Sequence, residues 1–370
     1  MNCSGRLLVY VALAPSPAAP ALLAADPAVD AKDRTAVINR AVGYLRSRQN
    51  ADGSFAPRLA GPGVSAVVAA GLIGNRVPND DPLLARTLAF LESKVQPDGG
   101  VYEQRMANYA TSVALVAFAG ANTGGKYDAV IRNATKFLRT LQAGDDGKLE
   151  SGDVRFGGLG YDGKSRPDMS NTQYFLEALQ AAGVGKNDPA VQRALVFVNR
   201  CQNLPGEHND QPFSAKATDD ERGGLVYNPI DPDKNDRDRT PQGGLRSAGA
   251  MTYGGLKSFL YAGVTKDDPR VQGAIKWIRV HYTLDENPGM GKAGLFYYYH
   301  TFGKAMSALG EGQFTDAKGV AHDWRRELFE ALKKRQRPDG SWINDGDRTF
   351  GESNPELATA FALLALSYCR

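Results

Sequence analysis

Six segments of the chain repeat apolar residues at steps of three and four, which is typical of a helix that buries one face. Leu84, Leu88 and Leu91 show this spacing in one segment, and the opposite faces of the segments are charged. Three segments begin with Asp-Pro, where the aspartate can cap free N–H groups and the proline lacks an N–H that would need a partner. We therefore expect six outer helices, at residues 36–49, 82–96, 127–142, 189–202, 269–282 and 322–336.

A second kind of segment follows each of the first. These segments are apolar or small on nearly all sides, as in residues 64–72 and 358–366. A helix without a polar face is buried on most sides. Strand-like alternation is absent, so we expect an all-α protein with six inner helices, at residues 63–75, 108–121, 170–184, 249–264, 296–310 and 355–369.

A turn motif connects the outer segments to the inner ones. It consists of a glutamine, a turn with glycine, and in its clear copies an aromatic residue. The clear copies are residues 49–55, 96–102 and 336–342, and the looser ones begin at Gln142 and Gln202. The remaining copy, the fifth in chain order, keeps only Gly294, Leu295 and Phe296.

Alternation of six outer with six inner helices predicts a closed (α/α)6 toroid, because each helical hairpin can bury its apolar face only against its neighbours. The inner helices would line a central cavity. We expect one domain over residues 26–370, with a long polar insertion loop at about 203–246 that could lie over the cavity mouth.

Composition narrows the class of protein. Hydrophobic residues make up 42% and charged residues 23%, which is enough to bury a large core. A net charge of +3 argues against a protein built around nucleic-acid binding. Residues 7–25 are uncharged and follow Arg6, so residues 1–25 fit a secretory signal and predict export to the periplasm or outside the cell. The alternative is a disordered tail.

The turn motif resembles the QW-type repeat of the terpenoid cyclase and protein prenyltransferase superfamily. The resemblance covers about residues 36–370, and the copy at 336–342 is the sharpest. The chain looks most similar to bacterial prenyltransferase/squalene oxidase repeat proteins, which are related to the C-terminal half of squalene cyclases. This resemblance implies an isoprenoid-type lipid in the central cavity. It says less about the reaction, since one fold hosts many functions.

The cyclase acid has no full counterpart here. Squalene–hopene type cyclases use Asp-x-Asp-Asp, whose middle aspartate protonates an alkene. The matching segment begins at Asp168, places Ser170 where the proton donor stands, and continues with Asn171. A serine cannot protonate an alkene, which argues against squalene cyclisation. Asp168 could line the cavity or simply cap the following helix.

The zinc site of the prenyltransferases is also incomplete. Their histidine lies in a segment that Tyr299, His300 and Thr301 resemble, but residues 246–253 contain neither the aspartate nor the cysteine that would complete the site. We therefore predict no metal and no cofactor.

His300 is the only histidine expected on an inner helix. It would share a helix face with Phe296 and Lys304, at steps of four residues. That face could form an aromatic wall with one titratable group. The alternative is a hydrogen-bonded histidine between packed helices.

Aromatic and charged residues are expected near one mouth of the ring. Tyr109, Tyr174 and Tyr253 lie in the first turns of inner helices, where they could contact an isoprenoid chain or stabilise a carbocation, or could be ordinary core residues. Arg246 and Glu356 lie near the same rim, where they could meet a polar head group or simply pair with each other.

Three hypotheses follow. The first is an isoprenoid-binding or isoprenoid-transforming protein, with Asp168, Asn171, Tyr253, Tyr299 and His300 as the site. The second is a non-catalytic exported scaffold, which a ring centre filled by side chains would favour. The third is a carbohydrate-active enzyme, which would need several of the polar candidates to converge. We expect a small hydrophobic ligand and no nucleic acid, and leave peripheral membrane contact open.

Overall fold

The computed structural model describes residue 1 and residues 29–145, 147–229, 238–347 and 349–370. The segment predicted as an export signal lies, apart from Met1, outside the described residues, so export stays a prediction. Among the described residues, no helix has both the length and the hydropathy to span a membrane.

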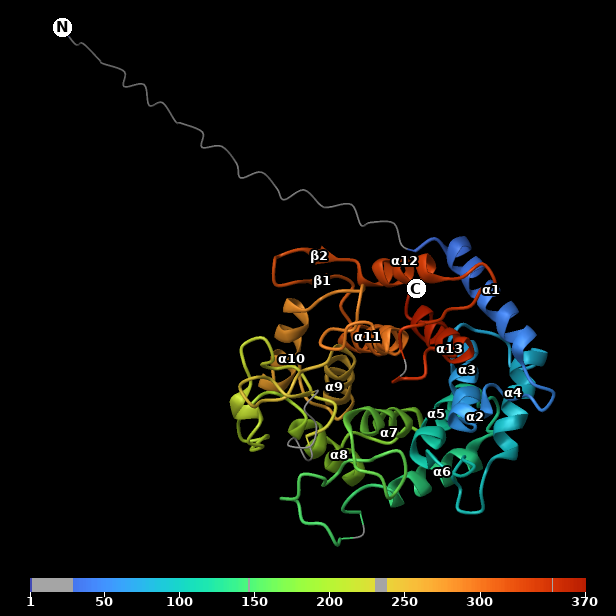
Figure 1. Cartoon of the computed structure of the whole chain (residues 1–370), viewed down its shortest axis with the longest axis horizontal. Helices are drawn as coiled ribbons and strands as arrows, with labels where there is room; N and C mark the ends of the chain where they lie inside the picture. Colours follow the sequence, from blue (N-terminus) through green and yellow to red (C-terminus); the bar gives the residue numbers. More distant parts are fainter. Residues whose placement is uncertain (2–28, 146, 230–237, 348) are drawn as a thin grey trace.

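The helices form two concentric layers (Figure 1). The outer layer consists of α1 (Ala31–Arg48), α4 (Pro82–Ser93), α6 (Asp128–Thr140), α8 (Pro189–Arg200), α10 (Pro269–Val280) and α12 (Trp324–Arg335). The inner layer consists of α3 (Gly63–Gly74), α5 (Ala107–Gly120), α7 (Met169–Ala181), α9 (Gly249–Tyr261), α11 (Leu295–Leu309) and α13 (Pro355–Leu366). The prediction of an all-α fold with six outer and six inner helices is confirmed.

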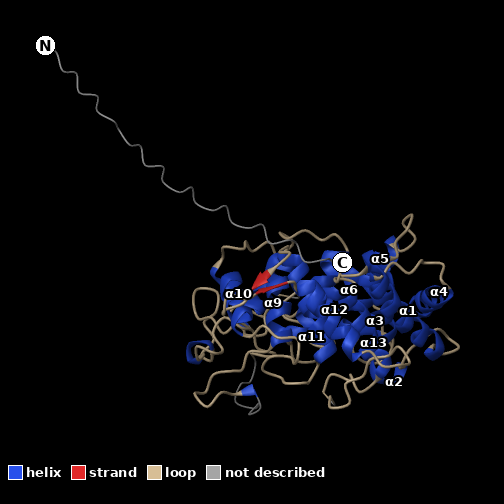
Figure 2. Ribbon diagram, turned by 90° about the horizontal axis from the view of Figure 1, so that it is seen from above, coloured by secondary structure: helices blue, strands red, loops and turns tan. Residues whose placement is uncertain are grey.

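The inner helices close a ring. Each packs against the next in chain order, and α13 packs against α3 to complete the circle. In the view of Figure 2, turned by 90°, the helices of both layers lie at about the same level, with loops on the two faces of the ring. A residue on the inward face of an inner helix can therefore meet residues from helices far away in the sequence.

Four small elements were not predicted. A short helix, α2 (Pro57–Ala60), precedes α3, and a single 3-10 turn, η1 (Ser214–Lys216), lies in the long loop. The strands β1 (Phe314–Thr315) and β2 (Ala321–His322) pair as an antiparallel hairpin before α12. His322, which we expected on an outer helix, therefore lies on a strand. Periodicity cannot reveal elements this short.

Aspartate caps fix where the outer helices begin. Asp81, Asp188 and Asp268 each accept a backbone N–H of the following turn, as predicted. The predicted start of the first helix at residue 36 was wrong. Asp30 accepts hydrogen bonds from the N–H groups of Lys32 and Asp33, so α1 begins at Ala31.

The turn glycines bring each hairpin against the next outer helix. A methyl group at Gly340 would overlap the backbone carbonyl of Arg40 in α1, and φ of Gly340 is +89°, which disfavours any side chain. Four other turn glycines share both features, each facing the backbone of the following outer helix: Gly53, Gly99, Gly157 and Gly223.

The turn glutamines tie the same two parts together. The side-chain amide of Gln336 donates to the carbonyl of Gly340, at 3.0 Å, and to that of Val37 in α1, at 2.9 Å. One side chain thus joins the last hairpin to the first helix. Equivalent pairs of hydrogen bonds to a turn glycine and the next outer helix are made by three further glutamines: Gln49, Gln142 and Gln202.

Replacing Gly340 by alanine should weaken ring closure. We expect the free energy of unfolding to fall by about 2–4 kcal/mol, because the new side chain adds a strained φ and a backbone overlap. Gly312→Ala is the control, since a side chain there meets nothing within 4 Å and its φ is not positive. Urea denaturation of both variants measures the difference, and equal stabilities would contradict this account of the turn.

Candidate functional site

Side chains of α7 and α11 meet across the middle of the ring. These helices are not neighbours, because α9 lies between them, so contacts between them cross the ring interior. The hydroxyl groups of Ser170 and Tyr297 lie 2.9 Å apart, and Nζ of Lys304 donates to Oε2 of Glu177 at 2.5 Å. Tyr297, His300 and Lys304 follow one another at helical spacing on this face of α11.

The shared face predicted for α11 was half right. His300 and Lys304 lie on it together, but the aromatic residue of that face is Tyr297. Phe296 packs edge-on against Tyr299, with ring centroids 5.9 Å apart. One residue is a rotation of about 100° on a helix, and periodicity fixes a face no more finely than this.

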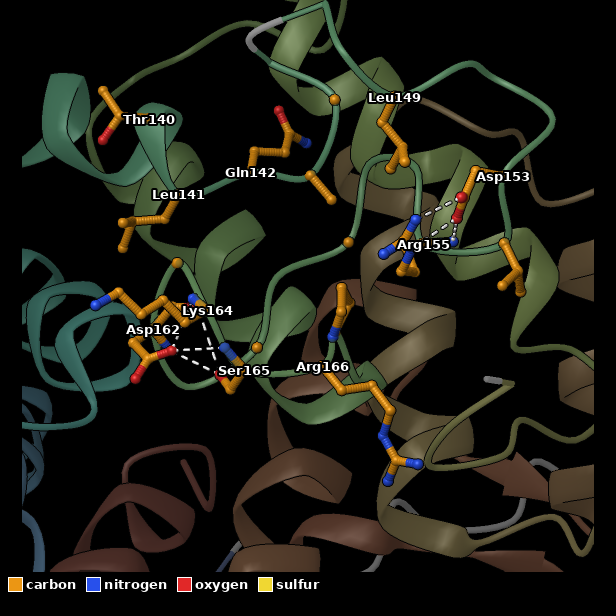
Figure 3. A pocket seen from close by; sticks show the side chains of 17 residues that line it. Thr140, Leu141, Gln142, Leu149, Asp153, Arg155, Asp162, Lys164, Ser165 and Arg166 are labelled. Carbon is orange, nitrogen blue, oxygen red and sulfur yellow. Dashed lines mark hydrogen bonds and ion pairs between the residues drawn. The ribbon is translucent and has the colours of Figure 1, made fainter. Parts of the chain in front are cut away.

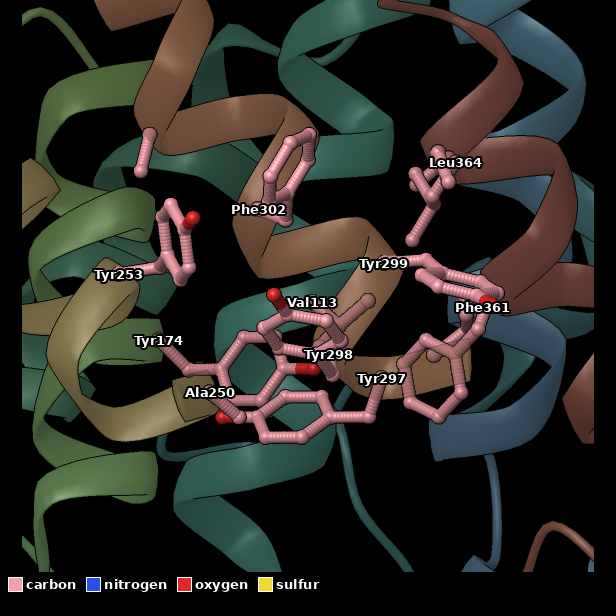
Figure 4. Packing of buried hydrophobic residues seen from close by; sticks show 14 of the residues in the cluster. Val113, Tyr174, Ala250, Tyr253, Tyr297, Tyr298, Tyr299, Phe302, Phe361 and Leu364 are labelled. Carbon is pink, nitrogen blue, oxygen red and sulfur yellow. The ribbon is translucent and has the colours of Figure 1, made fainter. Parts of the chain in front are cut away.

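Aromatic rings from several inner helices gather in the ring interior, among them those of Tyr174, Tyr297 and Phe361 (Figure 4). Ring centroids lie 5.2 Å apart for Tyr109 and Tyr174, and 6.1 Å apart for Tyr174 and Tyr297. Tyr297 also lies 5.7 Å from Phe361 and 5.8 Å from Phe350. We call these five residues, from α5, α7, α11, α13 and the loop before α13, the aromatic mouth. Of these five, only Tyr109 and Tyr174 were predicted from the sequence.

Deeper along the axis lies a group of polar side chains, which we call the axial charge cluster: the charged residues Glu177, Lys257 and Lys304, with the amide of Gln173. The carboxylate of Glu177 pairs with Nζ of Lys257 through one oxygen and with Lys304 through the other. Lys257 also donates to the side-chain carbonyl of Gln173 at 2.5 Å. Gln173 in turn donates to the hydroxyl of Tyr297, which connects the cluster to the aromatic mouth.

The charged groups of the cluster determine one another's protonation state. Burial acts to raise the pKa of Glu177, but the positive charges of Lys257 and Lys304 outweigh it and hold that pKa well below its usual range. Burial lowers the pKa of Lys257 to about 8 against the attraction of Glu177. For Lys304 the same attraction exceeds the cost of burial, so its pKa is raised. All three groups are therefore predominantly charged at neutral pH.

His300 lies beside this cluster with no hydrogen bond. It is 2% exposed, and neither ring nitrogen has a partner among the described residues. Burial lowers its pKa to about 3, so the imidazole is neutral at pH 7. Its ring stacks on Phe361 with centroids 6.2 Å apart. The expected alternative of a hydrogen-bonded histidine between helices therefore does not describe it.

Asp168 caps α7, which is one of the two roles that the sequence predicted for it. Its carboxylate oxygens accept from the backbone N–H and the side-chain amide of Asn171, both at 2.8 Å. Burial raises the pKa of Asp168 to about 6, although these hydrogen bonds oppose the shift. Ser170, at the position of the cyclase proton donor, is paired with Tyr297.

Five other candidates, three aromatic and two charged, lie away from the axis. Tyr253 packs against Tyr298 and Phe302 on the side of α11 that faces the outer layer, and Phe296 packs against Tyr299. The hydroxyl of Tyr299 donates to the carbonyl of Leu284.

Arg246 and Glu356, the charged candidates at the rim, do not pair with each other. Arg246 is exposed, and Glu356 pairs with Arg48 at 3.5 Å. In the described part of the chain, no hydrogen bond or ion pair joins any two of Asp168, Arg246, Tyr299, His300 and Glu356.

A further buried acid was missed. Glu352 is fully buried and accepts the backbone N–H of Tyr297 at 2.7 Å and the amide of Asn344 at 3.0 Å. Burial raises the pKa of Glu352 to about 7. The helix α11 begins after Gly294, which has no side chain to cap it, so Glu352 supplies the acceptor from another loop. Nothing local in the sequence indicates this long-range cap.

Two pockets lie outside the inner ring. One of about 770 Å³ lies in the loop between α6 and α7, where Asp153 and Asp162 face Arg155 and Lys164 (Figure 3). The other, of about 510 Å³, lies beside α10 at Trp277. Neither lining includes a described inner-helix residue. Within the described residues, no group of three histidine, cysteine or acidic side chains is arranged to hold a metal ion.

Known proteins resemble this ring in sequence and in structure. The family model of the squalene-hopene cyclase C-terminal domain matches residues 60–219. The apo structure of the type II terpene cyclase MstE from Scytonema superposes with a TM-score of 0.53 and 14% identity, over 91% of this chain and 97% of that one. The resemblance to the terpenoid cyclase superfamily is confirmed. A complex of an MstE variant with its substrate, geranylgeranyl dihydroxybenzoate, has a TM-score of 0.50, also with 14% identity over 91% of this chain and 97% of that one.

Proteins with other activities have a similar fold as well. A D-mannose isomerase superposes with a TM-score of 0.52 and 10% identity, over 92% of this chain and 97% of that one. No curated protein sequence matches the chain significantly. At these identities the structural likeness concerns the fold, and the function must be argued from the site.

The raised pKa of Asp168 predicts a pH-dependent stability. Because the folded state holds the proton more tightly than the unfolded state, wild-type protein should lose stability as pH rises from about 4 through 6. A shift from 3.8 to about 6 corresponds to about 3 kcal/mol. Asp168→Asn removes the titration, so the difference in unfolding free energy between wild type and variant should fall by about this amount between pH 4 and 7.

The matched control is Asp188→Asn, which alters another helix cap. A hydrogen bond from Arg139 lowers the pKa of Asp188, so that difference should instead rise with pH. Chemical denaturation at several pH values measures both. A difference for Asp168→Asn that does not change with pH would contradict the burial argument.

Proposed function

We propose that this protein binds an isoprenoid-type lipid at the aromatic mouth. The observation that carries the proposal is the convergence of Tyr109, Tyr174, Tyr297 and Phe361 from four different inner helices. Core packing needs contacts between adjacent helices, whereas these rings gather where four helices face one another. Aromatic faces suit the branched, unsaturated units of an isoprenoid chain.

The fold is consistent with this ligand class. The related fold of MstE holds geranylgeranyl dihydroxybenzoate in a substrate complex. The fold alone does not choose a ligand, but the aromatic mouth and the fold agree on a hydrophobic one.

The proposal is binding without proton-initiated cyclisation. An alkene needs a strong acid, and the hydroxyl of Ser170 is too weak to serve. Asp168 is the nearest acid in sequence, but both of its oxygens are already occupied by hydrogen bonds from Asn171.

A scaffold function is the second candidate. The axial charge cluster joins α7, α9 and α11 through buried side chains, and so fills part of the ring centre with protein. That observation suits a ring whose role is structural. The unsatisfied nitrogens of His300 favour a ligand instead, because a purely structural core rarely leaves a buried imidazole without hydrogen bonds.

Two adjacent tyrosines on α11 test the lipid proposal. Both are buried, but Tyr297 belongs to the aromatic mouth, whereas the hydroxyl of Tyr298 donates to the carbonyl of Thr283. We expect Tyr297→Leu to weaken the binding of geranylgeraniol about tenfold, through the loss of roughly 1.4 kcal/mol of ring contact. Tyr298→Leu is the control and should lower stability without changing affinity.

Isothermal titration calorimetry with geranylgeraniol in detergent gives both affinities, and thermal unfolding confirms that each variant is folded. Equal losses for the two variants would point to general destabilisation. Absence of binding by the wild type would reject the lipid proposal and favour the scaffold.

A further inference from the structure

The axial charge cluster contains more positive than negative charge. Lys257 is fully buried and Lys304 is 14% exposed, yet the only carboxylate with which either forms an ion pair, in the described part of the chain, is Glu177. His300 is neutral and contributes no charge. The cluster therefore carries one excess positive charge inside the ring.

An excess buried charge needs compensation. A charge removed from water is costly unless an opposite charge and hydrogen bonds replace the water. Both oxygens of Glu177 are already used, one by each lysine, so this residue cannot neutralise a second ammonium group. The imbalance is met most directly by an anion that enters from outside the chain.

His300 supplies an independent indication of a ligand. Its two nitrogens are buried and without partners among the described residues, and it lies on the same face of α11 as Lys304, one turn away. A neutral imidazole can donate one N–H to an anionic oxygen. The charge imbalance and the missing hydrogen bond thus occur at the same place.

We propose that His300 and the axial charge cluster bind the carboxylate head of the lipid, so that the ligand is an isoprenoid carboxylic acid. This inference rests on the proposed lipid function and specifies its ligand. A singly charged carboxylate matches one excess positive charge, and its oxygens would accept the N–H of His300 and the ammonium protons of Lys304.

The position of the aromatic mouth fits this orientation. Tyr297 precedes His300 by three residues on α11, a rise of about 4.5 Å along the helix. The lipid head would lie at His300, and the isoprenoid tail would continue past Tyr297 to Tyr174 and Tyr109, whose rings follow one another. One ligand would then use both the polar and the aromatic features of the axis.

The test compares geranylgeranoic acid with geranylgeraniol, which share a hydrocarbon chain. We expect calorimetry at pH 7.5 to show at least tenfold tighter binding of the acid.

Lys304→Met removes the excess charge but leaves Lys257 and Glu177 as a balanced pair. It should keep its affinity for the alcohol and lose the preference for the acid, while the loss of the ion pair with Glu177 lowers its thermal stability. Lys304→Arg should restore that preference.

The control variant is Lys266→Met, which removes an exposed lysine that pairs with Glu311 at 4.0 Å. It should change neither affinity. Equal binding of acid and alcohol by the wild type would overturn the carboxylate site and leave the lipid proposal intact. An unchanged acid preference in Lys304→Met would also overturn it, since the ammonium group of Lys304 would then not contact the carboxylate.

A second measurement separates the two proposals if neither lipid binds. That result would reject the lipid function. The anion site is then decided by thermal unfolding in sodium acetate. In the reference series, sodium perchlorate replaces the acetate, so that both series have the same ionic strength. Acetate should raise the unfolding temperature of the wild type and not that of Lys304→Met. An equal response of both proteins would overturn the anion site.

Discussion

The ring depends on one side-chain amide that serves two hairpins at once. Gln336 donates to its own turn at Gly340 and to Val37 in the first outer helix, so the turn after the last outer helix is joined to the first one. The close approach of Gly340 to the backbone of Arg40 is what brings these groups within reach. Because each contact across the axis joins helices far apart in sequence, the site exists only when the circle is closed.

Much of this fold could be predicted because its determinants are local and repeated. The step of three and four, the Asp-Pro caps and the turn glycines each act over a few residues, and six pairs of outer and inner segments make the ring evident. The errors fall where the determinant is not periodic. The start of α1 depends on Asp30 outside the apolar pattern, and the cap of α11 comes from Glu352, more than forty residues away.

The site was predicted less completely, for a geometric reason. Tyr174, His300 and Lys304 were recognised, but Tyr297 was not, because composition shows that a helix is rich in tyrosine without showing which one faces the axis. Glu177 and Lys257 carried a usable signal that was overlooked. A charged residue in an otherwise apolar inner helix has no solvent to face, so it must meet an opposite charge across the ring.

The same excess charge also decides which chemistry the ring can support. Cyclisation of an isoprenoid passes through carbocations, and a carbocation about 5 Å from an unbalanced ammonium would be repelled by roughly 3 kcal/mol at an effective dielectric constant of about 20. Such a penalty slows a reaction by about two orders of magnitude. An anionic ligand gains from the field that a carbocation would oppose. The charge of Lys304 therefore agrees with the serine at position 170, since both disfavour proton-initiated cyclisation at this axis.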